Sequence, residues 1–198
     1  LTDAGSVWII GRDGSNWLHG DLQVNAATPA VNENFGVSTD IDGSYAVFGA
    51  MGYQGGAGAN EGAAYVFQLQ GSQWTQQQRL VPSAPFAGAK FGRGISISGN
   101  TIVGGAPNRT VSFANQGAGY VFVRNGSTWS QQAVLIASDG AAGDNFGVST
   151  AIDGDTAVVG AYLDDSGALT DCGGAYIYTR SAGVWTQIMR IGASDAAA

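Results

Sequence analysis

The sequence predicts an all-β protein, a β-propeller of four-stranded antiparallel blades with about three and a half blades in this chain. Three observations support this prediction. A phrase of glycine, two small residues, an aromatic residue and a short apolar run recurs four times. Each copy ends on a tryptophan, and the intervals between these tryptophans are 57, 55 and 56 residues. The 32 glycines indicate many tight turns, and a repeat of this length is one structural unit stacked on copies of itself.

The last copy shows the strands of one unit. The turn pair Asp153-Gly154 separates two short apolar segments, and a polar loop from Leu163 to Asp171 precedes two longer ones. Four strands joined in this way describe a propeller blade. The predicted strands span 146–152, 156–161, 174–180 and 185–191.

The earlier copies repeat this order. Phe35-Gly36 and Phe91-Gly92 open their first strands, and Asp42-Gly43 and Gly99-Asn100 turn the chain into the second strands. We therefore expect a single domain over 1–198. It consists of a half blade at 1–30 and three blades at about 31–85, 86–141 and 142–198.

The residue types differ between the expected inner and outer strands. Inner strands are rich in Gly, Ala, Ser and Val, which let neighbouring sheets approach each other. Outer strands carry aromatic residues that can fill the widening gap between blades, and the alternative is an exposed aromatic ladder that stacks sugar rings. These aromatic residues are Tyr65, Trp74, Tyr120, Trp129, Tyr176 and Trp185.

The repeat resembles a known family. Phe-Gly at a strand start and a strand end such as Gly105-Ala106-Pro107 resemble the FG-GAP repeat of integrin-type β-propellers. The linker at 137–147, Ala-Ser-Asp-Gly-Ala-Ala-Gly-Asp-Asn-Phe-Gly, is similar to a bacterial subtype, and 193–197 repeats its start. The resemblance implies an extracellular protein with an adhesive or ligand-binding role.

Composition excludes some partners. The net charge is −7 and Lys90 is the only lysine, whereas nucleic acids and anionic membranes require basic surface. No apolar run reaches the roughly 18 residues expected of a membrane-spanning helix. Cys172 is the only cysteine, so no disulfide forms within the chain. A start at Leu1 without methionine or signal peptide is expected of a processed or excised product.

Three and a half blades would leave two apolar sheet faces open. Three explanations follow from the sequence. The chain is part of a longer propeller, or it packs on further copies in a ring or filament, or another polypeptide supplies the missing strands. The expected partners are therefore other protein chains or copies of itself.

Calcium is a candidate ligand at one loop. Integrin-type blades often carry an Asp-rich calcium loop between their first two strands, and those connections are too short here. Asp164, Asp165 and Asp171 in the last long loop are the alternative oxygen donors, and a solvated acidic loop is the other interpretation.

Other candidate sites are sparse. Tyr53 and Tyr162, in variable loops, are candidates for stacking a carbohydrate. Asn108 and Asn125 open N-glycosylation sequons. The only histidine, His19, has no nucleophile motif near it, and no catalytic residue is predicted.

We therefore expect a secreted or cell-surface module that is not an enzyme and that mediates contacts with proteins or surfaces. A lectin-like propeller that binds glycans and a self-assembling filament subunit are the alternative functions.

Overall fold

The computed structural model describes residues 2–165 and 169–193, apart from the side chains at 13 and 17–21. These residues form four antiparallel sheets, and none of their segments is a helix long and apolar enough to cross a membrane. The two-stranded sheet contains β1 (Val7–Asp13) and β2 (Asn16–Val24). The three complete blades contain β3 (Phe35–Asp42), β4 (Tyr45–Ala50), β5 (Ala63–Gln70) and β6 (Gln73–Leu80); β7 (Gly94–Ser98), β8 (Thr101–Ala106), β9 (Ala118–Asn125) and β10 (Thr128–Leu135); and β11 (Ser149–Asp153), β12 (Thr156–Ala161), β13 (Gly174–Ser181) and β14 (Val184–Ile191).

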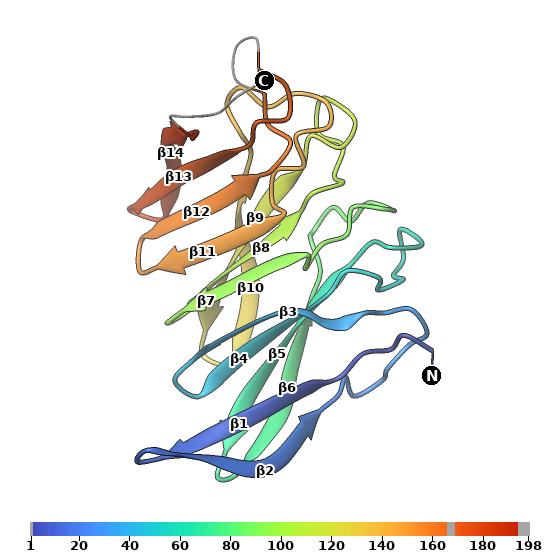
Figure 1. The fold of residues 1–198 in the computed structure, drawn as a ribbon, viewed down its shortest axis with the longest axis vertical. Coiled ribbons are helices and arrows are strands. Elements are labelled where there is room, and N and C mark those ends of the chain that lie inside the picture. Colours follow the sequence, from blue (N-terminus) through green and yellow to red (C-terminus); the bar gives the residue numbers. More distant parts are fainter. Residues whose placement is uncertain (1, 166–168, 194–198) are drawn as a thin grey trace.

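Within each complete blade the strands pair in chain order, so each blade is a meander. Figure 1 shows the four sheets following one another along the long axis, from β1 and β2 near one end to β11–β14 near the other. Two-residue turns join the first to the second strand and the third to the fourth. Long loops at 51–62, 107–117 and 162–173 join the second strand to the third. The predicted all-β propeller architecture is confirmed, and the sheets are arranged as blades of a partial propeller.

The predicted first strand of the last blade, 146–152, begins three residues too early, because β11 starts at Ser149. Phe146 forms instead a parallel bridge with Gly117 of the preceding blade, and Gly147 has a φ of 98°. Such a positive φ ends strand geometry and favours glycine. In the second and third complete blades the Phe-Gly pair therefore precedes the first strand and joins two blades, whereas Phe35-Gly36 opens β3 as predicted.

The same joint occurs three times along the chain. Gly5 pairs with Phe35 and Gly62 pairs with Phe91, as Gly117 does with Phe146. At each joint a Cβ on the first glycine would collide with the backbone of the phenylalanine. Each phenylalanine then packs edge-on against aromatic rings of its own blade, as Phe35 does on Tyr65 with ring centroids 5.4 Å apart.

Packing between blades changes from the axis outwards. The first strands β3, β7 and β11 of successive blades lie close together, whereas the fourth strands make few contacts with one another. Small residues make the close approach possible, since a Cβ at Gly94 would meet the backbone of Ser149 in the next blade. Most outer aromatic side chains are buried core residues, as predicted: Tyr65, Tyr120, Trp129 and Tyr176.

The two outermost sheets lack a neighbour on one side. Leu80 and Leu135 end the fourth strands β6 and β10, and each is only 2% exposed. Ile191 holds the same position in β14 and is 46% exposed. At the other end, Trp8 of β1 is 54% exposed, whereas its counterpart Tyr65 is 1% exposed beneath Phe35.

Candidate functional site

A cleft of about 570 Å³ lies where three successive blades meet. The starts of the three long loops and the segments around two Phe-Gly joints form its walls. The cleft therefore collects side chains that are far apart in the sequence. They are Met51, Lys90, Arg93, Pro107, Asn108, Asn145, Val148 and Tyr162.

The cleft holds two cations that have no partner among the described residues. Lys90 is half-buried and Arg93 is exposed. Within the described residues neither side chain makes an ion pair, a hydrogen bond or a stacking contact. Other arginines are engaged by a ring or a carboxylate: Arg79 with Tyr53, Arg109 with Phe86, Arg124 with Tyr45, Arg180 with Asp155, and Arg190 with Asp164.

The two candidate stacking tyrosines have different surroundings. Tyr162 lines the cleft and is 55% exposed, so its ring is available to a ligand. Tyr53 is partly buried against the core, and the Arg79 guanidinium lies 4.6 Å from its ring centroid. The structure thus places Tyr162, and not Tyr53, beside the unpaired cations. Neither binding role is tested, and both stay predictions.

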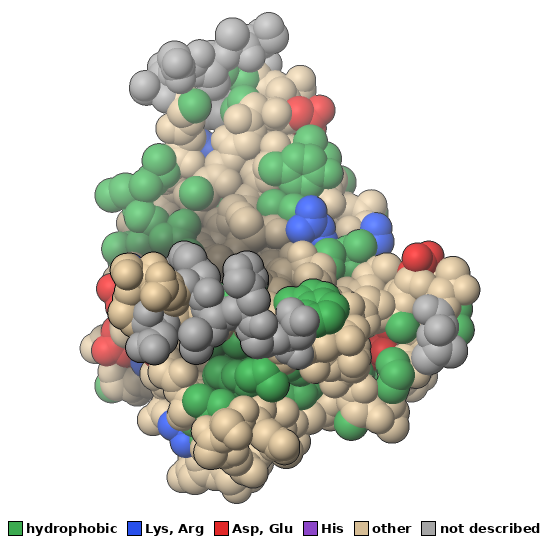
Figure 2. All heavy atoms as spheres, turned by 60° about the horizontal axis from the view of Figure 1, so that its bottom comes forward, with side chains coloured by type: hydrophobic (Ala, Val, Ile, Leu, Met, Phe, Trp, Pro, Cys, Tyr) green, Lys and Arg blue, Asp and Glu red, His purple; other side chains and the backbone are tan. Residues whose placement is uncertain are grey.

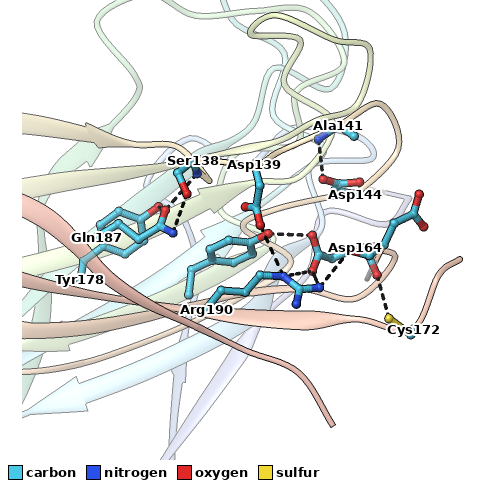
Figure 3. Close-up of polar contacts among 11 residues, drawn as sticks. Ser138, Asp139, Ala141, Asp144, Asp164, Cys172, Tyr178, Gln187 and Arg190 are labelled. Carbon is cyan, nitrogen blue, oxygen red and sulfur yellow. Dashed lines mark hydrogen bonds and ion pairs between the residues drawn. The ribbon is translucent and has the colours of Figure 1, made fainter. Parts of the chain in front are cut away.

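The candidate calcium loop is organised around Arg190 (Figure 3). Asp164 is buried, accepts a hydrogen bond from the Tyr176 hydroxyl at 2.7 Å, and accepts another from Arg190 Nε at 2.8 Å. Arg190 Nη2 also pairs with Asp164, and Asp139 lies 3.7 Å from Arg190 Nε. Burial and the hydrogen bond to Asp164 raise the pKa of Tyr176. The carboxylate of Asp164 is therefore already neutralised by a cation of the chain.

The other two predicted ligands have separate roles in the loop. Asp165 Oδ1 accepts a hydrogen bond of 2.8 Å from the amide of Asp171, which has a φ of 52°. No group of three or more acidic, histidine or cysteine side chains in the described residues is arranged to hold a metal ion. The arrangement of Asp164, Asp165 and Asp171 does not favour calcium, and calcium binding stays an untested prediction.

Three further carboxylates are buried beside the Phe-Gly joints and long loops. Glu33 accepts a hydrogen bond from the Ala30 amide at 2.9 Å and another from the Tyr65 hydroxyl. Glu61 accepts from the Ala57 amide at 2.8 Å, and Asp144 from the Ala141 amide at 2.6 Å. These side chains close their own loops, as expected for buried acceptors. Burial raises the pKa of Asp144, and the neighbouring carboxylates Asp139, Asp164 and Asp165 raise it further.

The remaining candidates stand apart from one another. Asn125 is exposed at the end of β9, beside a turn. Asn108 is half-buried and lines the cleft, so a glycan attached there would fill it. Use of either sequon stays a prediction. The side chain of His19 lies outside the described residues, and Cys172 is a free thiol whose Sγ lies 3.5 Å from the Asp164 carbonyl oxygen.

Comparison with protein families agrees with this geometry. The family model described as FG-GAP repeat matches the chain three times, over residues 25–67, 74–122 and 129–178. The chain belongs to the FG-GAP repeat family. Each match ends in the third strand of a blade, and the second and third matches begin in the fourth strand of the blade before. No curated protein matches the chain.

Membership of the FG-GAP repeat family supports a coarse function. These repeats form β-propeller modules for protein interaction and are typical of extracellular or surface proteins. The family match assigns no role to the cleft, and no motif in the sequence marks Lys90 or Arg93 as functional. A position-by-position comparison of the three repeats would have found both, because the other repeats carry uncharged residues there.

Proposed function

We propose that this FG-GAP propeller segment is a secreted or cell-surface module that has a structural or adhesive role through contacts with protein and has no catalytic activity. The exposure of Ile191 is the main support. Its counterpart Leu135 is covered by the following blade, beside Phe146. A residue that is a core position in every earlier blade is thus open to solvent in β14, and contact with another sheet would bury it.

Two further apolar residues of β14 are open to solvent in the same way. Ile188 and Met189 are 56% and 52% exposed. In the first complete blade, the corresponding residues of β6 are Gln77 and Gln78. Polar residues therefore suffice at these two positions, and the apolar pair in β14 is suited to contact with a partner.

The half blade offers a second apolar surface. In the part of the chain that the structure describes, β1 has no strand on its inner edge, and a hollow of about 280 Å³ lies between β1, β3 and β4. Trp8 and Ile10 line it and are each more than half exposed. In Figure 1 β1 and β14 lie near opposite ends of the molecule. Further copies could therefore stack head to tail, which supports a filament as the second candidate function.

Several observations support the other parts of the proposal. The buried carboxylates Glu33, Glu61 and Asp144 bind amides of their own loops, and Asp164 is paired with Arg190. These contacts favour a structural role for the four carboxylates. The net charge of −7 and the family's usual location support a secreted or surface protein.

The test is the native mass of the chain over a range of concentrations, by light scattering after size exclusion. The double variant Ile188→Gln/Met189→Gln copies the first complete blade and should keep the fold. We expect the wild type to associate as concentration rises and the double variant to stay closer to the monomer mass. Phe113→Ser changes an exposed apolar residue in a loop, away from the end sheets, and serves as the control. A wild type that stays monomeric and binds no apolar dye would contradict the proposal.

A further inference from the structure

The three repeats allow each cleft residue to be compared with its counterparts in the same chain. Lys90 precedes a Phe-Gly pair, and Asn34 and Asn145 hold this position in the other repeats. All three residues adopt a left-handed backbone, with φ of 57°, 55° and 57° respectively. Asparagine tolerates this conformation better than lysine does. The fold alone therefore favours asparagine at position 90.

Arg93 departs from the repeat in the same blade. It follows the Phe-Gly pair, where the neighbouring repeats carry Val37 and Val148. Both cations thus replace uncharged residues within four positions of one joint. Neither is engaged by any described carboxylate, although acidic residues outnumber basic ones in the chain by 15 to 8. The other arginines contact a ring or a carboxylate of the chain, and Lys90 and Arg93 do not have this structural role.

The third departure also lines the cleft and comes from the next blade. Tyr162 follows a Gly-Ala pair, where the other repeats carry Met51 and Pro107. Its ring is 55% exposed, whereas Tyr65, Tyr120 and Tyr176 are buried. The cleft thus combines two unpaired cations, one open aromatic face and the half-buried amide side chain of Asn108.

We propose that the cleft binds an acidic sugar, a hexuronate unit of a polysaccharide. The sugar carboxylate would pair with Lys90 and Arg93, because charge-assisted hydrogen bonds to carboxylates are strong and arginine can bind them in bidentate fashion. The apolar face of the sugar ring would pack on Tyr162, and a hydroxyl would bond to the Asn108 amide. This binding function goes beyond the protein contacts proposed above and does not depend on them.

The size of the cleft favours a sugar over an acidic side chain of a protein. A volume of about 570 Å³ lies within the range of small-ligand sites and far exceeds one carboxylate side chain. Figure 2 shows Lys and Arg side chains on the right-hand half of this face, among hydrophobic and uncharged side chains. A protein interface of ordinary size buries about 800 Å² on each partner, so a single cleft of this kind is better matched to a small ligand.

The test is calorimetric titration of the whole chain with trigalacturonate. Three variants take their residues from the other repeats: Lys90→Asn, Arg93→Val and Tyr162→Met. We expect the wild type to bind with a Kd of about 1 mM or tighter, and the affinity to fall as salt increases. The Lys90→Asn/Arg93→Val double variant should bind at least about tenfold more weakly, and Tyr162→Met several-fold more weakly.

Two controls keep the result specific. Arg12→Gln removes one positive charge on β1, as each single cleft variant does, and should leave the affinity for trigalacturonate unchanged. The melting temperature and circular dichroism of each variant report on its fold. An unchanged affinity in the double variant, or no binding by the wild type, would overturn the proposal. Equal binding of neutral galactose trimers would overturn the role of the cations, and tighter binding of an oligoglutamate peptide would show that the ligand is an acidic protein segment instead.

Discussion

Gly117 and Phe146 form the parallel bridge that joins the second complete blade to the third. Gly117 has a φ of 89°, and a Cβ on it would collide with the carbonyl oxygen and the amide nitrogen of Phe146. The side chain of Phe146 is fully buried and meets Tyr176 with ring centroids 5.3 Å apart. Glycine at this position therefore brings two sheets into contact and also places a core residue.

Gly117→Ala should lower the free energy of unfolding by about 2 kcal/mol or more, because the strained backbone and the collision with Phe146 act together. Gly126→Ala is the matched control. Gly126 also has a positive φ, 62°, but nothing lies within 4 Å of its added Cβ. We expect it to cost about 1 kcal/mol. Equal losses for the two variants in urea titrations would show that the joint adds nothing beyond backbone strain.

Leu135→Ala should cost about 3 kcal/mol of stability, because it would leave a cavity between the second and third complete blades. Ile191→Ala, at the corresponding position of β14, should cost less than about 1 kcal/mol, because Ile191 already faces solvent. Chemical denaturation at low protein concentration measures both values. A large cost for Ile191→Ala that appears only at high concentration would indicate a partner copy on β14.

Asp164→Asn should lower the free energy of unfolding by about 3 kcal/mol, because the half-buried Arg190 guanidinium would lose its closest carboxylate and keep the more distant Asp139. Asp155→Asn is the comparison, since Asp155 pairs with Arg180 but its side chain is 67% exposed. That change should cost less than about 1 kcal/mol. Thermal melts at neutral pH would show the difference, and similar values for the two variants would contradict the structural role of the Asp164 pair.

Added calcium should leave the melting temperature unchanged, because Arg190 already neutralises Asp164 and the Asp165 carboxylate binds the Asp171 amide. The measurement is a thermal melt with calcium and with a chelator. A calcium-dependent rise that Asp171→Asn abolishes would show that the loop rearranges around an ion.

Asp144→Asn should raise the melting temperature at neutral pH. The pKa of Asp144 is above its ordinary value of 3.8 because the group is buried near other carboxylates. The Asp144 carboxyl therefore ionises more easily in the unfolded chain than in the folded one. The free energy of unfolding falls for this reason as pH rises from about 3.8 through the raised pKa. Asparagine keeps an oxygen for the Ala141 amide and carries no charge. The difference in melting temperature should close at about pH 3, where both states are protonated. A difference that is the same at both pH values would show another cause.

The sequence by itself determined the all-β class, the four-strand unit and its positions along the chain. These features were predictable because their signals are local: Asp153-Gly154 turns one strand into the next, and small residues in segments such as 156–161 allow close contact between sheets. The start of β11 was misplaced because the bridge between Gly117 and Phe146 joins residues of different blades, which strand periodicity does not report.

Only the tertiary structure decided the chemical role of the loops. Asp164 was predicted to share a site with Asp165 and Asp171, yet it pairs with Arg190, 26 residues further on, because antiparallel pairing of β13 and β14 sets Arg190 beside Tyr176. The cleft has the same origin. Lys90 and Tyr162 come from different blades and line one cleft only because successive blades pack around one axis. A local pattern fixes each blade, whereas the surroundings of a loop depend on how neighbouring blades pack.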